Sequence, residues 1–464
     1  MKKQIVLYAL AFLVALSIFS ALSTKVLFTD APQYINTAKE FAGLAISKVR
    51  NFSAWLYPLF LGQFLKVFPS LFTLQFLNVL WLVLDAILLY HMTKKKEVFL
   101  LFAFSPLTWI MAPWINPVVP ASFFLLLAYH LLKQYEAKRK LMYFISSGLS
   151  LGLVSALWWP GTYLCMLFML AFFYREKVLM ALGYLIPVIA TASIRFFIDA
   201  YYFGFPFFST IRGLGSNALY FLDKAEVIPG NPPSFLLFLV MLALVISPFL
   251  FKWYQVDKKK HRHELLFLLL ATLLFFLNYE IRYFITIAPL VILLLSTVLK
   301  KNEYVIHGAL SMMLIVVFTA SYFGVTEEYL IKQDISEIAR KYQGTTFIVG
   351  TEGVSEEQAM DISTLYWGRE IPRLITYRDW KMDVQKEKVY KEYSIESHAR
   401  INEVRKMKLS ITYLQSDNVD DASLKDLLIL GDVPPPEGFE LVKKYAIIMQ
   451  YRKISEIYLN NQNL

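Results

Sequence analysis

The sequence is dominated by long apolar runs that alternate with short loops rich in lysine and arginine. Runs of about 18 or more apolar residues are long enough to cross a hydrocarbon layer roughly 30 Å thick. Hydrophobic residues make up 57% of the chain, which is more than the packed core of a soluble domain requires. This pattern predicts an α-helical, multi-pass integral membrane protein.

We expect about eleven membrane-spanning helices of a length that fits the bilayer. The predicted ranges are 4–23, 71–92, 98–113, 118–132, 141–158, 162–174, 178–198, 234–251, 265–279, 284–299 and 304–323. With this count the Lys and Arg clusters of the loops all fall on one side, which the positive-inside rule assigns to the cytoplasm. The N-terminus is then cytoplasmic in the cell membrane. The net charge of +10 reflects this orientation and does not indicate nucleic-acid binding.

Two parts of the chain fall outside the predicted spans. The loop 24–70 contains two short pieces, 32–47 and 54–68, and the second is apolar but too short to cross comfortably, which favours the membrane interface. After about residue 330, charged residues become frequent and apolar runs shorten to lengths typical of strands. We therefore expect a transmembrane domain, 1–325, that includes the outer loop, and a small extracytoplasmic α/β domain, 330–464.

Within the α/β domain, short runs of β-branched and aromatic residues predict strands, and longer amphipathic stretches predict helices. The predicted strands are 345–349, 409–414 and 445–451, the predicted helices are 356–366 and 395–408, and a turn is expected at Pro434–Gly438.

Polar residues gather at the predicted outer ends of the spans, where they can converge on a cavity that opens outward. They are Asp30, Gln33, Tyr34, Asn116, Arg195, Asp199, Arg212, Asp223, Glu226, Glu280, Arg282 and Tyr283. Such a cavity suits a lipid-borne substrate, whose polar head would sit among these side chains while its tail lay among the helices. Membrane lipid is therefore an expected partner.

One reaction that fits this arrangement is the transfer of a sugar from a lipid phosphate to a hydroxyl. Asp30 would act as a general base, worth roughly 10²–10⁴-fold. Arg282 would bind the leaving phosphate through two parallel hydrogen bonds, and Glu280 would hold Arg282 or bind a sugar hydroxyl. Two other interpretations stay open: Asp30 can cap a helix that starts at Pro32, and Arg282 can be an interfacial anchor.

Other ionisable residues give weaker indications. Asp85 lies inside a predicted span and is a functional candidate by position, although pairing with an inner cation is the simpler expectation. No histidine cluster is expected on the outer side, so a His-rich zinc site is not expected and no cofactor is certain. A divalent metal is possible but is not indicated by the sequence. Cys165 is the single cysteine, so no disulfide forms within the chain.

Several short motifs occur in a fixed order along the first 300 residues. They are Asp30 with Tyr34 and Ala38; Leu56-Tyr57-Pro58-Leu59 with Lys66-Val67-Phe68; Ser105-Pro106 with Asn116-Pro117; Arg195 with Phe203-Gly204-Phe205-Pro206; and Glu280-x-Arg282-Tyr283 with Pro289. Together they resemble the glycosyltransferase C superfamily, in particular its branch of dolichyl-phosphate-mannose protein mannosyltransferases and aminoarabinose transferases.

This resemblance implies an inverting glycosyltransferase of the hexosyl or mannosyl type. The donor would be a polyprenyl-phosphate-linked (dolichyl-phosphate-linked) sugar, and the acceptor a protein hydroxyl, a glycan or a lipid at the outer membrane face. Asp30 would be the catalytic base. The residues implied at the donor phosphate are Arg282 and Arg195, and those implied in substrate binding are Tyr34, Tyr57, Asn116, Glu280 and Tyr283.

The sequence departs from the family pattern at three positions. Ala31 stands where many relatives carry a second acid, Asn116 where an acid often precedes the proline, and Trp159 where an arginine commonly precedes Pro160. These departures leave the sugar and the acceptor open, and they keep a catalytically inactive relative as an alternative.

A transporter or flippase for a lipid or sugar is the main rival class. Such proteins usually have two related halves and ionisable groups near the middle of the membrane. This sequence shows no internal repeat, and its charged residues cluster at the predicted outer ends. A receptor with a membrane anchor is a third class, but about eleven spans exceed what an anchor needs.

Overall fold

The computed structural model describes most of the helical part of the chain and the strands of the C-terminal part. The described residues are 2–23, 31–44, 56–173, 178–203, 206–207, 254–278, 281–300, 302–304, 308, 334, 337, 346–349, 374–376, 426–430, 438–445 and 448–454. They fall into two compact units, one made of Met1–Val26, Asn51–Tyr57 and Leu74–Phe323, and the other of Leu27–Arg50, Pro58–Thr73 and Gly324–Leu464. Each unit is considered by itself.

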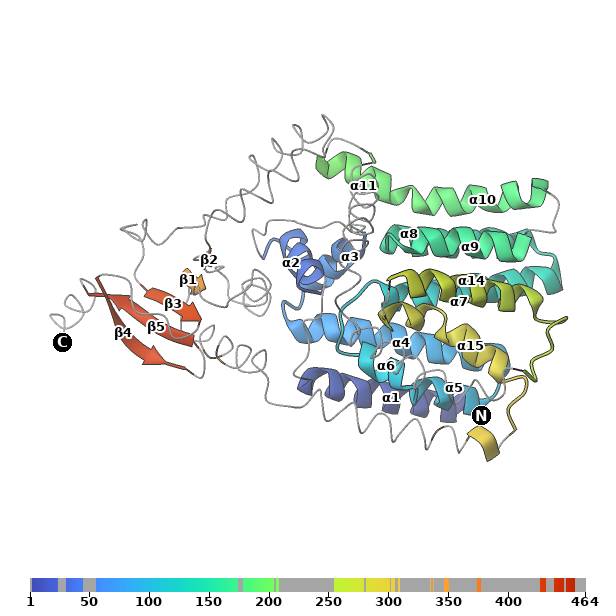
Figure 1. Ribbon diagram of the computed structural model, residues 1–464, viewed down its shortest axis with the longest axis horizontal. Coiled ribbons are helices and arrows are strands. Elements are labelled where there is room, and N and C mark those ends of the chain that lie inside the picture. The colour runs from blue at the N-terminus through green and yellow to red at the C-terminus, as the bar shows by residue number, and fades with distance from the viewer. Residues whose placement is uncertain are drawn as a thin grey trace, which may run out of the picture. The chain divides into compact units, whose positions relative to one another are not determined.

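The first unit is a bundle of helices. Its members are α1 (Lys2–Leu22), α4 (Leu71–Thr93), α5 (Lys96–Ala103), α6 (Pro106–Met111), α7 (Val118–Lys138), α8 (Leu141–Leu157), α9 (Gly161–Phe173), α10 (Val178–Ala192), α11 (Ile194–Phe203), α14 (Arg262–Asn278), the 3₁₀ helix η2 (Ile281–Thr286) and α15 (Ala288–Leu295). Most of the long helices lie side by side with their axes nearly parallel (Figure 1). The bundle is therefore built as expected for a chain with many apolar runs.

The observed helices agree closely with the predicted spans where the chain is described. Three helices in the described part are long and apolar enough to cross a membrane: Gln4–Leu22, Leu71–Thr93 and Val178–Tyr201. The helix α7 continues six residues beyond the predicted end at residue 132. The predicted spans 234–251 and 304–323 lie outside the described residues, apart from Tyr304 and Gly308.

Three predicted spans are broken, and proline explains two of the breaks. The predicted helix 98–113 divides into α5 and α6, because Pro106 lacks the backbone N–H that a continuous helix needs and starts a new helix instead. The predicted helix 284–299 likewise divides into η2 and α15, with Pro289 in the first turn of α15. A single turn residue, Ser193, divides the predicted helix 178–198 into α10 and α11, which together make up the membrane-length helix Val178–Tyr201.

Small residues allow close contact between α8 and α10. A Cβ atom built on Gly148 would lie 2.6 Å from Cγ of Pro187, and one built on Gly152 would collide with Oγ1 of Thr191 and the carbonyl of Val188. The two glycines are four residues apart, so they lie on one face of α8. This spacing lets the backbones approach as they do at small-residue interfaces in membranes.

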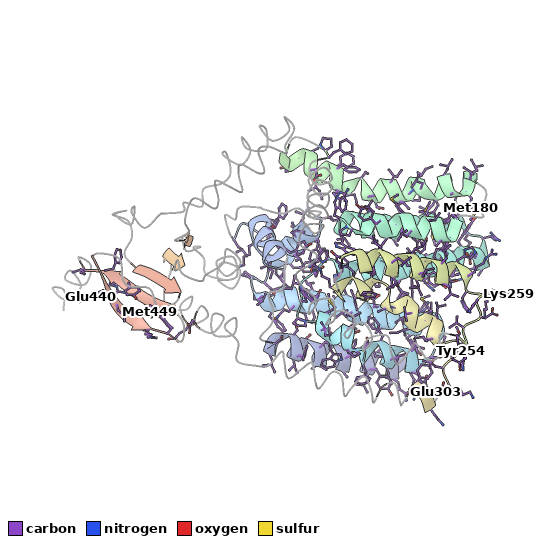
Figure 2. All side chains as sticks on the ribbon, viewed as in Figure 1. Met180, Tyr254, Lys259, Glu303, Glu440 and Met449 are labelled. Carbon is purple, nitrogen blue, oxygen red and sulfur yellow. The ribbon has the colours of Figure 1, made fainter. Side chains whose placement is uncertain are left out.

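One end of the bundle carries its basic loops. We call it the basic end and define it by Lys94–Lys96, Lys138–Lys140, Lys258–Arg262 and Lys300. Met180, Tyr254, Lys259 and Glu303 all lie at this end in Figure 2. Lys95 Nζ donates to the carbonyl of Ser296 at 2.7 Å, which ties two of these loops together. Loops that the sequence assigns to one side of the membrane therefore meet at one end of the structure.

The second unit contains two short helices and a sheet. The helices α2 (Ala31–Phe41) and α3 (Leu56–Leu65) cover parts of the predicted pieces 32–47 and 54–68. They pack closely, because a Cβ atom on Gly62 would lie 2.8 Å from both the Ala38 carbonyl and Cβ of Phe41. With ten residues, α3 is too short to cross a bilayer, as the sequence predicts.

The sheet has five strands in the order β2-β1-β3-β5-β4. They are β1 (Thr346–Val349), β2 (Leu374–Thr376), β3 (Asp426–Leu430), β4 (Phe439–Lys444) and β5 (Ile448–Lys453). β1 runs parallel to β2 and β3, while β5 runs antiparallel to β3 and β4. The sheet is mixed, and its central strand β3 is an apolar run that the sequence analysis did not assign.

Two of the predicted strands are found in this sheet. The predicted strand 345–349 corresponds to β1, and the predicted closing strand 445–451 corresponds to β5 with its start shifted to residue 448. Gly438 adopts a φ of 82°, which places a turn at the end of the predicted Pro434–Gly438 segment. The predicted strand 409–414 and the predicted helices 356–366 and 395–408 lie outside the described residues.

Candidate functional site

Three connecting segments meet at the end of the bundle opposite the basic end. They are the link from α6 to α7 (residues 112–117), the turn from α8 to α9 (residues 158–160) and η2. The helices α6, α7, α14 and α15 all pack against η2. We call this region the Arg282 end, because it holds the arginine that the sequence singles out.

Arg282 is buried, with 6% of its surface exposed, and lies among aromatic rings. Its guanidinium carbon is 5.3 Å from the ring centroid of Tyr283 and 5.9 Å from that of Trp114. The Tyr283 ring in turn contacts Trp158 at 4.9 Å and Phe275 at 5.7 Å between centroids. A guanidinium beside aromatic faces keeps its charge in a region from which water is largely excluded, where an anion would be bound strongly.

Hydrogen bonds fix the backbone of η2 next to Arg282. Ser122 Oγ, on α7, donates to the Ile285 carbonyl at 2.9 Å, and Thr286 Oγ1 donates to the Tyr283 carbonyl at 2.6 Å. Both hydroxyls are buried. The position of Arg282 is therefore set by contacts to α7 as well as by its own segment.

A second set of hydrogen bonds holds the link from α6 to α7. Asn78 Nδ2, on α4, donates to the carbonyls of Met111, Ala112 and Trp114 at 2.8, 3.0 and 3.1 Å. Ser20 Oγ, on α1, donates to the Ala112 carbonyl at 3.2 Å. These groups satisfy carbonyls at the end of α6 that have no helical partner. The sequence analysis missed Asn78, although a lone amide inside an apolar span was a usable indication.

The side-chain amide of Asn116 makes a hydrogen bond through its oxygen but none through its nitrogen. Its Oδ1 accepts a hydrogen bond from the Val118 N–H at 3.1 Å, so it caps the start of α7. Its Nδ2 is buried and has no hydrogen-bond partner in the structure, and the whole residue is 1% exposed. The sequence places Asn116 among the substrate-binding candidates, and it lies two residues from the Trp114 ring that faces Arg282.

Trp159 also lies at the Arg282 end and carries a buried donor without a partner. The residue is 6% exposed, its Nε1 has no partner, and its ring lies edge-on to Tyr163 at 5.2 Å. The turn that carries it is tight, because the Gly161 N–H donates to the Trp158 carbonyl at 3.0 Å and a Cβ on Gly161 would collide with the Val154 carbonyl. The sequence analysis noted Trp159 only as a departure from a family pattern.

Arg195 lies in a different neighbourhood from Arg282. It is 3% exposed on α11, its guanidinium carbon lies 5.4 Å from the Phe196 ring, and it interacts with the charge of Asp199 one turn further along the helix. Asp199 is fully buried. Arg195 therefore has an acidic neighbour on its own helix.

Asp85 does not form the ion pair that the sequence favoured. It lies on α4, is fully buried, and neither carboxylate oxygen has a hydrogen-bond partner in the structure. Ser122, whose side chain interacts with Asp85, donates its own proton to the Ile285 carbonyl. The expectation of a cation beside Asp85 was wrong, because no basic side chain of the bundle reaches that depth of α4 in the described part of the chain.

The remaining candidates are two tyrosines on the short helices α2 and α3 and two acids in the part of the chain that is not described. Tyr34 on α2 and Tyr57 on α3 are both buried. Lys39, near the end of α2, is buried as well, and this burial lowers its pKa to about 7. The sequence analysis did not single out Lys39. Asp30 and Glu280 lie outside the described residues.

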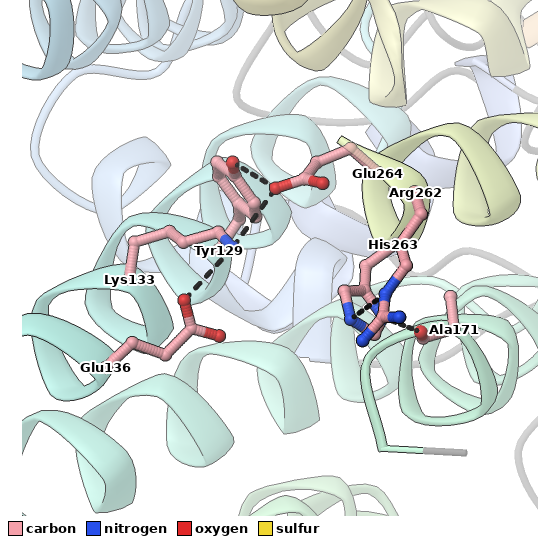
Figure 3. Close-up of polar contacts among 7 residues, drawn as sticks. All are labelled: Tyr129, Lys133, Glu136, Ala171, Arg262, His263 and Glu264. Atoms are coloured by element: carbon pink, nitrogen blue, oxygen red, sulfur yellow. Dashed lines mark hydrogen bonds and ion pairs between the residues drawn. The ribbon is translucent and has the colours of Figure 1, made fainter. Parts of the chain in front are cut away.

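The basic end holds a polar network of its own, which Figure 3 shows. Glu264 Oε1 accepts a hydrogen bond from the Tyr129 hydroxyl at 2.8 Å and lies 3.1 Å from Lys133 Nζ, which also pairs with Glu136 at 3.0 Å. His263 Nδ1 lies 2.8 Å from the Ala171 carbonyl. These contacts join α14 to α7 and α9.

Opposing effects set the charge of the central pair in this network. Burial acts to raise the pKa of Glu264, but the Lys133 charge and hydrogen bonds from the Glu264 N–H and the Tyr129 hydroxyl lower it below its ordinary value. Burial acts to lower the pKa of Lys133, but the charges of Glu264 and Glu136 together raise it. Both groups are therefore ionised at neutral pH, and the pair holds the bundle together rather than serving as a site.

Comparisons with known proteins point to one fold. No protein-family model matches the chain, and no curated protein matches it by sequence. Among solved structures it is similar to ArnT from Cupriavidus metallidurans bound to undecaprenyl phosphate, with a TM-score of 0.64, 10% sequence identity, and coverage of 97% of this chain and 98% of ArnT. The apo state of the same ArnT gives a TM-score of 0.60 at 10% identity, covering 96% and 97% of the two chains. The chain therefore has the fold of this ArnT structure.

Proposed function

We propose that this protein is an inverting glycosyltransferase that takes a sugar from a polyprenyl-phosphate donor. The observation that carries the proposal is the buried Arg282 guanidinium in a chain whose fold matches, along nearly its whole length, an ArnT structure that binds undecaprenyl phosphate. A guanidinium matches the geometry of phosphate, and its charge is more effective where water is excluded. The donor lipid would place its phosphate at the Arg282 end and its tail along the apolar helices.

The reaction requires a base on one side of the sugar and a phosphate-binding cation on the other. The acceptor hydroxyl attacks the anomeric carbon from the face opposite the phosphate, a new carbon–oxygen bond forms, and the bond from that carbon to the phosphate oxygen breaks. Asp30 takes the hydroxyl proton, and Arg282 stabilises the charge that develops on the departing phosphate. The product has the opposite configuration at the anomeric carbon.

The other candidate residues are assigned to substrate binding. Glu280 would hold Arg282 or a sugar hydroxyl, and Tyr283 contributes one of the rings beside the guanidinium. Arg195 would reach the phosphate only at the cost of its attraction to Asp199, so its role in phosphate binding is secondary. Tyr34 and Tyr57 belong to the two short helices that follow Asp30 in the chain.

We further propose a hexosyl donor of the mannose type and an acceptor that is a protein hydroxyl, a glycan or a lipid on the extracytoplasmic side. The Lys and Arg clusters of the loops support this orientation, because the basic end that they form would face the cytoplasm. The domain 330–464 would then be extracytoplasmic. Its sheet offers a surface for choosing the acceptor.

The proposal is tested with purified protein in lipid nanodiscs, a panel of radiolabelled polyprenyl-phosphate sugars and a membrane extract as acceptor. Wild type should release the sugar from one donor, and Asp30→Asn should lower that rate by about 10²-fold or more. Arg282→Lys keeps a positive charge but loses the paired hydrogen bonds, so it should retain a part of the activity that Arg282→Gln loses.

A transporter predicts a different outcome from the same samples. Asp30→Asn would leave movement of the labelled lipid across the bilayer largely intact, and wild type would release no sugar. Absence of sugar release from every donor by folded wild-type protein would therefore reject the transferase.

A further inference from the structure

Two buried hydrogen-bond donors lie on segments that contact the consecutive residues Arg282 and Tyr283, and neither donor has a hydrogen-bond partner. They are Nδ2 of Asn116, in the link from α6 to α7, and Nε1 of Trp159, in the turn from α8 to α9. The residues that carry them are 1% and 6% exposed. Leaving a buried donor unpaired costs about 1–3 kcal/mol, so two such groups at one end of a bundle call for an explanation.

Each donor belongs to a residue whose near neighbour in the chain contacts Arg282 or Tyr283. Asn116 follows Trp114 by two residues, and the Trp114 ring lies 5.9 Å from the Arg282 guanidinium. Trp159 follows Trp158, whose ring lies 4.9 Å from that of Tyr283. The two donors therefore lie on segments that contact two consecutive residues of η2, one segment at Arg282 and the other at Tyr283.

We propose that Asn116 and Trp159 bind the sugar of the donor lipid, and that they select a sugar presenting oxygen atoms, such as a neutral hexose, over an amino sugar. This inference rests on the proposed function. An amide NH₂ and an indole N–H donate hydrogen bonds and accept none. They pair with the oxygen of a hydroxyl, whereas an ammonium group would bring more donors against them. Because Arg282 is assigned to the phosphate of the donor lipid, we assign the donors of Asn116 and Trp159 to the sugar that is attached to this phosphate.

The structure offers an informative contrast within each residue type. Asn78 Nδ2 donates to three carbonyls, and Trp109 Nε1 donates to the Ala103 carbonyl at 2.8 Å. Those two donors have a structural use, and those of Asn116 and Trp159 do not. Polar groups that are buried without a structural use are expected where a ligand supplies the missing partner.

Two substitutions remove the proposed donors and keep the other contact that each side chain makes. Asn116→Asp keeps the oxygen that caps the Val118 N–H and replaces the free NH₂ with an acceptor oxygen. Trp159→Phe removes the indole N–H and keeps an aromatic ring beside Tyr163. Trp109→Phe is the matched control, because it also removes one buried indole N–H but at a position that already has a protein partner.

The experiment measures release of labelled sugar from undecaprenyl-phosphate mannose, undecaprenyl-phosphate glucose and undecaprenyl-phosphate aminoarabinose, with the acceptor extract present. Wild type should use a neutral sugar in preference to aminoarabinose. Trp159→Phe and Asn116→Asp should each raise KM for the neutral donor by about tenfold, the worth of one neutral hydrogen bond at its upper range. Asn116→Asp should also reduce the preference of the enzyme for the neutral-sugar donors over the aminoarabinose donor.

Inhibition by sugar-free undecaprenyl phosphate separates the sugar from the phosphate. Trp159→Phe should leave its inhibition constant within about twofold of wild type, because the lost N–H does not contact the phosphate. Thermal unfolding of Trp159→Phe should stay at the wild-type temperature, whereas Trp109→Phe should unfold earlier and keep the wild-type sugar preference.

Three results would overturn the inference while leaving the proposed function intact. They are an unchanged KM in both variants, an equal loss of affinity for the sugar-free lipid in Trp159→Phe, and a wild-type preference for aminoarabinose. Failure of wild type to release any sugar is a separate outcome, which rejects the proposed function and the inference with it.

Discussion

Replacing Lys133 with methionine tests the ion pair that joins α7 to α14. Glu264 is 2% exposed and has Lys133 Nζ 3.1 Å from its Oε1. Methionine keeps most of the length of the lysine stem and removes the ammonium group, which lies 5.6 Å from the Tyr129 ring centroid and 5.9 Å from that of Phe172. Glu264 would then remain buried with the Tyr129 hydroxyl but without its cation.

The size of the effect follows from burial. Removing one partner of a buried ion pair costs about 3–5 kcal/mol. Lys133 is 33% exposed, so solvent screens part of its charge, and we expect a loss of about 2 kcal/mol in the free energy of unfolding near neutral pH. Glu264→Gln keeps an acceptor for Tyr129 and should cost about 1 kcal/mol. The double variant should cost less than the sum of the two.

The pH dependence gives the prediction a sign. In wild type the pKa of Glu264 is lowered, so its contribution is present above the ordinary carboxyl pKa and is lost as pH falls through the lowered value. The pKa of Lys133 is raised, so its contribution is lost only as pH rises through that raised value. Without Lys133, burial raises the pKa of Glu264 instead. The penalty of Lys133→Met should therefore be smaller at about pH 5 than at about pH 8.

The assay is denaturant unfolding in mixed micelles of wild type, the two single variants and the double variant at both pH values. Single-variant losses that add to within about 0.3 kcal/mol in the double variant would show that the two residues do not interact. A Lys133→Met penalty that grows on acidification would refute the reasoning about the buried carboxylate.

Three further predictions concern the packing and polar groups of the bundle. Gly152→Val should prevent α8 and α10 from packing and yield little folded protein, whereas Gly183→Ala, where a Cβ meets nothing within 4 Å, should raise the unfolding temperature slightly; size-exclusion chromatography and thermal unfolding measure both. Asn78→Asp should cost at least about 2 kcal/mol because it removes the donor shared by three carbonyls, and a wild-type unfolding temperature would contradict this. Asp85→Leu should leave stability unchanged or higher in the same assay, because it removes a buried carboxylate that has no hydrogen-bond partner; a loss above about 2 kcal/mol would show that the carboxylate is structural.

The positions of most helices could be predicted from the sequence because each is a continuous apolar run. The predicted spans 71–92, 141–158 and 162–174 differ from the observed helices by a single residue at either end. Length and hydropathy are properties of the local sequence, so no tertiary information is needed. The breaks at Ser105 and Ser193 were missed because an apolar run stays apolar whether or not its helix is continuous.

Only some residues of the candidate site could be predicted from the sequence. Arg282, Tyr283 and Asn116 were singled out because polar residues at the ends of apolar runs are conspicuous. Asn78 lies within an apolar run, and its use became apparent only when α4 was seen beside the end of α6. Trp159 was noted from the sequence only as a departure from a family pattern, and its buried N–H without a partner became apparent only in the structure.

The sequence by itself determined that this chain is a helical membrane protein and where most of its described helices begin and end, because hydrophobic length is read directly from consecutive residues. The tertiary structure decided which polar groups contact each other. The Trp114 ring lies beside Arg282 although the two residues are far apart in the sequence. The Ser122 hydroxyl likewise donates to the Ile285 carbonyl of η2, although 163 positions separate the two residues. Hydrogen bonds and ring contacts of this kind depend on how helices pack, and no local pattern records which helices become neighbours. The same packing leaves two donors free beside Arg282, and it is these that point to the sugar.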